Sequence, residues 1–181
     1  MNNQFHPDQI DPSVFVAPSA DVVGDVTIGA ASSVWFHSVV RGDIARIVIG
    51  QRTNLQDGCV VHVDPGMPTT IGDGVSVAHG VVVHGAVVED DVLIGMGAII
   101  LSGARIGRES IIGSGALVTG GTVVPPRSLV LGLPGRVVRA ITDEELETIR
   151  RTATRYVQHA QEYRRSLPTS APPPPSAVDR A

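Results

Sequence analysis

Three histidines, His62, His79 and His84, are the residues of this 181-residue chain best suited to chemistry. Neutral imidazoles are common metal ligands, and three of them leave a coordination position open for water or a substrate. An amide and an acid, Gln56 and Asp57, lie shortly before them in the sequence. Since a lone histidine is more often a structural residue than a ligand, the metal-site hypothesis depends on whether the fold brings the three rings together.

The element that must position these residues is a repeat of six. Aliphatic residues recur through most of the chain at Val16, Val22, Ile28, Val34, Val40, Ile49, Leu55, Val61, Ile71, Val77, Val83, Val88, Ile94, Ile100, Ile106, Ile112, Val118, Val124 and Val130. A period of six matches neither a strand nor a helix, but it matches a short strand followed by a tight turn, with three units closing one triangular coil. We therefore predict a mainly β fold, a parallel β-helix of hexapeptide repeats. The alternative, a β-sandwich of short strands, would need alternating patterns and irregular spacing.

The repeat also predicts which side chains stack. Residues at equal positions three repeats apart should lie one strand spacing apart, about 4.8 Å. Arg41, His62 and His84 hold one such position, while Asp57 and His79 share another on the preceding face. The three imidazoles cannot easily meet within one chain, but they could meet between copies, and three copies around a threefold axis would form three such sites. The same geometry places Arg41 of one copy near Asp57 of the next.

A helix should follow the coil. Thr142 and Glu145 form a capping box, and an apolar stripe at helical spacing comes after them. The proline-rich end of the chain has the composition of a disordered tail. The predicted organisation is an N-terminal segment (1–15), a β-helix domain (16–134), a linker (135–141), a C-terminal α-helix (142–166) and a disordered tail (167–181).

Composition limits the possible partners and location. Hydrophobic residues make up 43% of the chain and aromatic residues only 3%, which predicts an aliphatic core. The net charge of −4 argues against nucleic acid or an anionic membrane as partner. No stretch approaches the roughly 20 apolar residues needed to span a bilayer, the first ten residues lack a signal-peptide core, and the single cysteine, Cys59, has no internal disulfide partner. We expect a soluble cytoplasmic protein.

The motifs resemble those of a known family. R-G-D at 41–43, N-L-Q-D at 54–57 and the three histidines, the last two separated by five residues, are similar to the gamma-class carbonic anhydrase family. The resemblance covers the coil and the C-terminal helix, and it implies that the coil is left-handed. It also implies a homotrimer with zinc, or iron or cobalt, held by His62 and His84 of one chain and His79 of its neighbour.

The resemblance assigns roles to further residues. Asp43 and Gln56 match residues that order and orient a metal-bound water, Asn54 matches a residue that lines the substrate pocket, and Tyr156 matches a tyrosine near the metal. The implied reaction is the reversible hydration of CO2 to bicarbonate, in which a metal-bound water ionises near pH 7 and attacks CO2.

Arg41 and Asp57 match the family's intersubunit ion pair, but two other features depart from its best-known members. Ile44 stands where those members carry a glutamate. The loop after His62, V-D-P-G-M-P-T-T, is short and offers only Asp64 in place of an acidic residue that carries protons. Because each hydration cycle must release a proton, we expect slow turnover even with an intact metal site.

Other activities are possible on the same repeat. A hexapeptide-repeat acyltransferase would bind acyl-CoA in the intersubunit groove and use one histidine as a general base, which leaves the stack of His62 and His84 without a role. A metal-dependent CoA thioesterase would use all three histidines. A non-enzymatic trimeric scaffold with a vestigial site is the third alternative.

Overall fold

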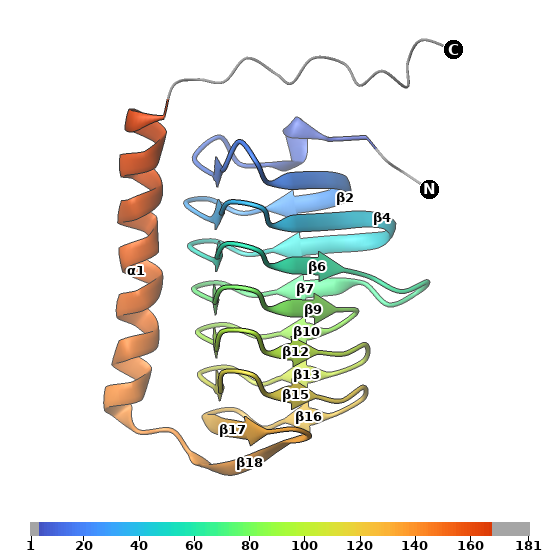
Figure 1. Cartoon of the computed structure of the whole chain (residues 1–181), viewed down its shortest axis with the longest axis vertical. Helices are drawn as coiled ribbons and strands as arrows, with labels where there is room; N and C mark the ends of the chain where they lie inside the picture. The colour runs from blue at the N-terminus through green and yellow to red at the C-terminus, as the bar shows by residue number, and fades with distance from the viewer. Residues whose placement is uncertain (1–3, 168–181) are drawn as a thin grey trace.

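The computed structural model describes residues 4–167, which form a β-coil with one long helix beside it (Figure 1). Almost all strand pairs are parallel, each strand pairing with the strand one turn further along the coil. The expectation of a mainly β, parallel β-helix followed by a C-terminal helix is confirmed. Of the predicted disordered tail, residues 168–181 lie outside the described residues.

One face of the coil is covered by the helix, and we call it the helix-covered face. Its parallel strands are β1 (Phe15–Val16), β3 (Ser33–Val34), β5 (Asn54–Leu55), β8 (Ser76–Val77), β11 (Leu93–Ile94), β14 (Ile111–Ile112) and β17 (Ser128–Gly132). The helix α1 (Asp143–Ser166) starts beside the last turns and ends beside the first ones (Figure 1).

A second sheet wraps around the other two faces, because its two longest strands, β2 (Asp21–Ile28) and β4 (Val39–Ile49), continue around a corner. The histidine face contains the start of β4, β6 (Val60–His62), β9 (Val82–His84), β12 (Ile99–Ile100) and β15 (Leu117–Val118). The third face contains the end of β4, β7 (Thr69–Ile71), β10 (Val87–Val88), β13 (Arg105–Ile106) and β16 (Val123–Val124). The position of each site residue is therefore determined by the turn and the corner of the coil on which the residue lies.

The corner of β2 and β4 depends on two glycines. Gly24 has a positive φ of 85°, and a Cβ atom there would collide with the carbonyl oxygen of Gly42 on the neighbouring strand. Only residues without side chains allow this close approach, which places Arg41 and Asp43 on either side of Gly42 at the corner.

The core is a stack of aliphatic side chains inside the coil. Every residue of the predicted six-residue series is buried except Val16, which is partly buried. Val77, for example, lies between Leu55 and Ile94 in neighbouring strands, and all three have no exposed surface. Burial of aliphatic groups at this density is the main stabilising contribution of the fold.

The helix begins at the predicted place. Thr142 accepts a hydrogen bond from the backbone N–H of Glu145, and the Glu145 side chain accepts one from the N–H of Thr142, so the expected capping box is present. Ile149 and its neighbours pack on outward-facing aliphatic residues of the helix-covered face, and Tyr156 packs edge-on against Trp35 with 5.5 Å between ring centroids.

The segment 135–141, predicted as a linker, is more ordered than expected. It connects coil and helix largely as β18 (Gly135–Ala140), which pairs antiparallel with β17. Five of its six residues are exposed, so the strand is held mainly by backbone hydrogen bonds and carries no apolar alternation that the sequence could reveal. One short 3-10 helix, η1 (Pro7–Gln9), precedes the coil.

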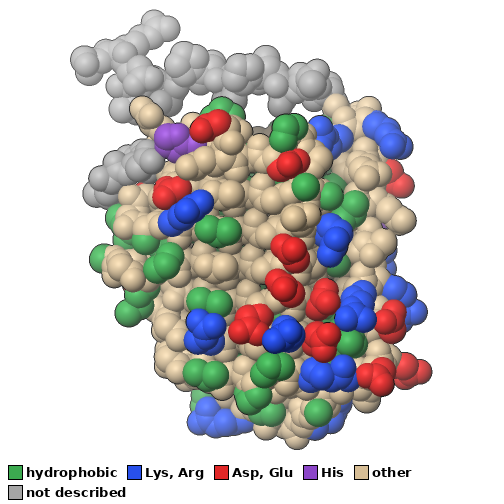
Figure 2. Space-filling view, turned by 180° about the vertical axis from the view of Figure 1, so that it is seen from behind, with side chains coloured by type: hydrophobic (Ala, Val, Ile, Leu, Met, Phe, Trp, Pro, Cys, Tyr) green, Lys and Arg blue, Asp and Glu red, His purple; other side chains and the backbone are tan. Residues whose placement is uncertain are grey.

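Charges are mixed on the surface. Acidic and basic side chains lie interspersed near the start of α1 (Figure 2), where Arg150 pairs with Asp91 and Glu109, and Arg127 pairs with Glu109 and Asp143. Within residues 4–167, no helix has the length and apolar character needed to cross a membrane.

Candidate metal centre

His62 and His84 form a stacked pair at one corner of the coil. They are register partners on β6 and β9, as the six-residue count predicts. His62 Nδ1 lies 3.0 Å from His84 Nε2, and the two rings stand nearly edge to face. The two nitrogens are therefore directed at one common point.

Asp43 holds the other side of the His62 ring. Its Oδ1 lies 3.0 Å from His62 Nε2, and its Oδ2 lies 2.5 Å from Arg41 Nη1. Burial opposes ionisation of Asp43, but the hydrogen bonds from His62 and Arg41 outweigh it and hold the pKa of this carboxyl below its usual value. Asp43 is thus a carboxylate that fixes the orientation of His62.

Ser102 and Asp64 hold the other side of the His84 ring. His84 Nδ1 lies 3.0 Å from Ser102 Oγ, and this hydroxyl donates to Asp64 Oδ2 at 2.5 Å. Neither residue was assigned this role from the sequence. Ser102 follows β12 one turn above Gly85, so counting repeats could have placed it next to His84.

His79 lies at a different corner, between the helix-covered face and the histidine face. Its Nδ1 is 2.9 Å from Asp57 Oδ2, both side chains are about half exposed, and no described residue contacts its Nε2. His79 lies in the turn before β9, whereas His84 is the last residue of β9, so the two rings lie at different corners of the coil. Within residues 4–167, no three His, Cys, Asp or Glu side chains of a single chain are arranged to hold a metal ion.

A groove of about 290 Å³ adjoins His79, and Gln56 and Tyr156 contribute to its lining. Gln56 donates from Nε2 to Asn54 Oδ1 at 3.1 Å, and both amides are buried. Burial, and then the negative charge of Asp57, raise the pKa of Tyr156 above its usual value, which keeps its phenol protonated at neutral pH. The structure therefore places Gln56 and Tyr156 in one groove with His79, and Asn54 contacts Gln56.

The ion pair expected between Arg41 and Asp57 of neighbouring chains stays a prediction. In the single chain Arg41 binds Asp43, two residues away, and Asp57 binds His79. Asp57 also accepts a hydrogen bond from the backbone N–H of Phe36 at 3.2 Å, so one carboxylate anchors both the turn and the imidazole.

The hydrogen bonds of the His62–His84 corner fit a bound cation. Four consecutive hydrogen-bond contacts connect the side chains of Asp43, His62, His84, Ser102 and Asp64, in that order. Each of these contacts requires one hydrogen atom. If both acids are carboxylates, the two neutral imidazoles and the one hydroxyl supply only three hydrogen atoms for these four contacts. If the contacts that involve Asp43, Ser102 and Asp64 each have their hydrogen, none is left for the contact between the two imidazoles. His62 Nδ1 and His84 Nε2 then present lone pairs to each other, an arrangement that fits a bound cation.

The distance between the two imidazole nitrogens also fits a bound metal ion. A tetrahedral zinc with Zn–N bonds of about 2.0–2.1 Å would hold two ligand nitrogens roughly 3.3 Å apart, close to the 3.0 Å observed. His62 and His79 each contact a carboxylate, and His84 reaches one through Ser102, the usual arrangement of metal-binding histidines. The residues therefore fit a metal with nitrogen ligands.

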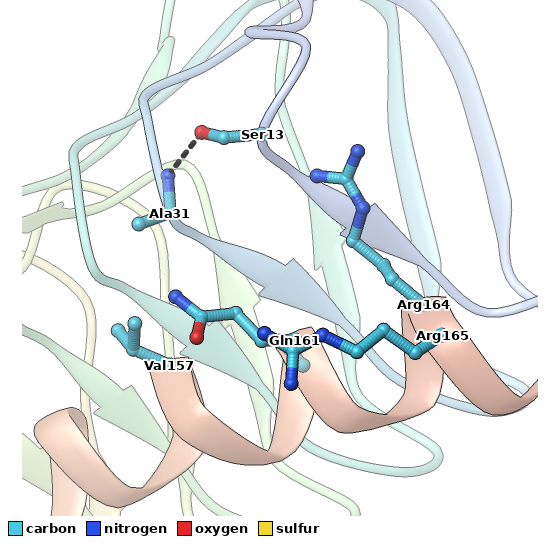
Figure 3. A pocket seen from close by; sticks show the side chains of 7 residues that line it. Ser13, Ala31, Val157, Gln161, Arg164 and Arg165 are labelled. Carbon is cyan, nitrogen blue, oxygen red and sulfur yellow. Dashed lines mark hydrogen bonds between the residues drawn. The ribbon is translucent and has the colours of Figure 1, made fainter.

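A second hollow, of about 330 Å³, lies between the end of α1 and the first turns of the coil (Figure 3). Val157, Gln161, Arg164 and Arg165 line it from the helix side, while Ser13 Oγ accepts a hydrogen bond from the N–H of Ala31 on the opposite side. It contains none of the predicted site residues.

Comparison with known proteins agrees with the fold and with the family resemblance. A family model described as bacterial transferase hexapeptide (six repeats) matches residues 85–120. The chain is 61% identical over 149 residues to a "Probable carbonic anhydrase" of Methanocaldococcus jannaschii, covering 82% of this chain and 94% of that protein. It is 43% identical over 158 residues to "Gamma carbonic anhydrase 2, mitochondrial" of Arabidopsis thaliana, covering 84% of this chain and 57% of that protein.

Among solved structures, a hexapeptide transferase family protein of Anaplasma phagocytophilum superimposes with a TM-score of 0.82 at 33% sequence identity, covering 85% of this chain and 91% of that one. The fold is thus shared with proteins described as hexapeptide transferases, and the relative with 61% identity is named a probable carbonic anhydrase. The chain belongs to the gamma-class carbonic anhydrase-like family of hexapeptide-repeat proteins.

Proposed function

We propose that the protein is a homotrimeric metalloenzyme that hydrates CO2 reversibly to bicarbonate, with each metal held by His62 and His84 of one chain and His79 of the next. The observation that carries the proposal is the paired orientation of His62 and His84, whose ring nitrogens face each other at 3.0 Å while their other nitrogens are held by protein groups.

The positions of the histidines support a ring of three copies. His62 and His84 lie at one edge of the histidine face and His79 at the other. If that face is directed at a threefold axis, each copy offers one edge to each neighbour, and the contact closes as a ring. A His79 from a neighbour would then complete the ligand set, and Arg41 would approach the neighbour's Asp57.

The outward residues of the histidine face support the same assembly. Val39, Val60, Val82, Ile99 and Leu117 are register partners on successive turns and form an apolar column on the outside of the coil. Val60 is 38% exposed and Ile99 37% exposed. A contiguous apolar column on the surface is typical of a protein interface. On the helix-covered face, by contrast, outward aliphatic residues are packed against α1.

The chemistry divides between the metal and the side chains. A bound zinc, our preferred metal, with iron or cobalt as alternatives, would act as a Lewis acid that brings the pKa of a water near 7, a magnitude taken from well-studied carbonic anhydrases. Gln56, oriented by Asn54, would hold the reacting water or bicarbonate by hydrogen bonding. Asp43 would keep His62 oriented, and the protonated Tyr156 would donate to an oxygen in the groove.

Proton release is the expected slow step. The loop after His62 offers only Asp64 as an acidic residue, and its Oδ2 is already engaged with Ser102. We therefore propose a lower turnover than that of relatives with an acidic loop. Cys59, buried and unpaired, is compatible with a reducing, cytoplasmic location.

The test is metal content and activity after anaerobic purification. We expect about one metal per chain and measurable CO2 hydration by stopped flow, both lost in His79→Ala. His159→Ala is the matched control for metal content, because His159 lies on α1 and contacts Glu162 and the Tyr156 ring, neither of which is a proposed metal ligand. Wild-type protein without metal would refute the proposal.

Metal without CO2 hydration would also refute it. Turnover of an acyl-CoA under those conditions would favour a CoA thioesterase, whereas acyl transfer in metal-free protein would favour a hexapeptide-repeat acyltransferase.

A further inference from the structure

The loop after His62 is short, but one of its residues reaches a ring of the metal site. The loop protrudes from the coil between β6 and β7 (Figure 1) and is closed by a bridge between Asp64 and Met67, with a hydrogen bond of 2.9 Å from the N–H of Met67 to the carbonyl of Asp64. This closure directs the Asp64 side chain back to the corner, where its Oδ2 lies 2.5 Å from Ser102 Oγ and 3.5 Å from His84 Nδ1.

The position of Ser102 depends on a glycine beside His84. Gly85 has a positive φ of 55°, and a Cβ atom there would lie 2.8 Å from Ser102 Oγ and 3.1 Å from Ser102 Cβ. Any larger residue at this position would push Ser102 away from the ring. The backbone of the His84 turn therefore leaves the room that the Ser102 hydroxyl occupies.

The two contacts of Ser102 together determine which nitrogen of His84 carries its hydrogen. A hydroxyl has a single hydrogen, and Asp64, as a carboxylate, can only accept. The Ser102 hydrogen therefore points to Asp64, and Ser102 Oγ presents a lone pair to His84 Nδ1. His84 Nδ1 must donate, which leaves its Nε2 as the lone-pair nitrogen directed at His62.

We propose that Ser102 and Asp64 are positioning residues that fix the ring orientation and the tautomer of His84 as a metal ligand. The inference rests on the proposed metal site. It gives the short loop a function other than proton transfer: Asp64 orients His84 through the Ser102 hydroxyl, whereas Asp43 contacts His62 directly. Partners of this kind contribute roughly 10- to 100-fold to metal affinity.

The test measures Co²⁺ affinity by competition with a chelator, together with the visible absorption of bound Co²⁺. Ser102→Ala and Asp64→Ala should each weaken Co²⁺ binding about 10- to 100-fold and change the visible spectrum. The double variant should lose little more than Ser102→Ala, because Asp64 acts through the hydroxyl. Ser102→Thr keeps the hydroxyl and should restore affinity and spectrum.

Ser110→Ala is the matched control. Ser110 is another serine at a turn of the coil, fully buried where Ser102 is partly buried, and its hydroxyl contacts backbone groups, the carbonyls of Arg108 and Pro125 and the N–H of Ser128. Its loss should lower stability and leave Co²⁺ binding unchanged. Asp64 is half exposed on a protruding loop, so Asp64→Ala should fold even if Ser102→Ala does not.

The outcomes separate the two proposals. Wild-type affinity and spectrum in Asp64→Ala and Ser102→Ala, with binding lost in His84→Ala, would overturn the role of the pair and leave the metal site standing. Wild-type protein that binds no Co²⁺, or His84→Ala that binds it normally, would overturn the proposed function itself.

Discussion

Ile99 and Ile100 are neighbours on β12, yet truncating them should have different consequences. Ile100 points into the coil between Val83 and Val118 and has no exposed surface, whereas Ile99 points outward and is 37% exposed. Ile100→Ala removes roughly three methylene groups, worth about 2.4 kcal/mol, and leaves a cavity, so we expect a loss of about 2–5 kcal/mol. Ile99→Ala should cost only about 1 kcal/mol within a single chain.

The assay is urea unfolding at several protein concentrations. With a denaturant slope of about 2 kcal/mol per molar, Ile100→Ala should lower the midpoint by roughly 1–2.5 M at every concentration. Ile99→Ala removes part of the apolar column of the histidine face. It should therefore weaken association and make the midpoint depend more steeply on protein concentration.

Two results would refute this reasoning. If Ile100→Ala and Ile99→Ala lowered the midpoint equally and independently of concentration, the outward column would be part of the single-chain fold and not an interface. If Ile100→Ala had almost no effect, the stack of aliphatic residues would not be the main source of stability.

Three further predictions concern side chains around the coil. Burial raises the pKa of the Cys59 thiol to about 12, so native protein should not react with a thiol reagent at pH 8 and should react once unfolded in urea. The hydrogen bond from Arg139 lowers the pKa of Glu145 to about 2 from 4.5, so the stabilising effect of the ionised Glu145 should be complete above pH 4.5 and disappear as the pH falls to 2. Glu145→Gln should remove this part of the acid dependence of the unfolding midpoint. An unchanged pH profile in this variant would contradict the prediction. Gln56→Ala should lower the CO2 hydration rate more than it lowers metal content, and equal losses would make Gln56 a structural residue.

The six-residue period predicted most of the fold because one physical requirement, a filled coil interior, recurs at every turn. It placed His62 beside His84 correctly, since register follows directly from counting. The period could not predict β18, because that strand is exposed and held by backbone hydrogen bonds, which leave no pattern in side-chain polarity.

The side-chain contacts around the histidines were harder to predict than the register of His62 and His84. Arg41 was expected to reach toward Asp57 of another chain, but in the single chain it binds Asp43, because the glycine corner of β2 and β4 brings these two residues together. Ser102 lies one coil turn beyond Gly85, the neighbour of His84, and contacts the His84 ring diagonally. Such diagonal contacts depend on rotamers and turn geometry, which spacing alone does not determine.

The central claim is that each metal is held by two different chains, and chains carrying His79→Ala and His84→Ala can test it by co-expression in equal amounts. Each variant alone lacks one ligand in every site. In a mixed ring of three, one junction joins an intact His62–His84 pair to an intact His79. Random mixing should therefore restore about one quarter of the wild-type metal content and CO2 hydration.

Recovery of about a quarter, from two variants that separately bind no metal, is the result predicted by a site shared between chains. Mixed protein that binds no more metal than the separate variants, in assemblies shown to contain both chains, would contradict the claim.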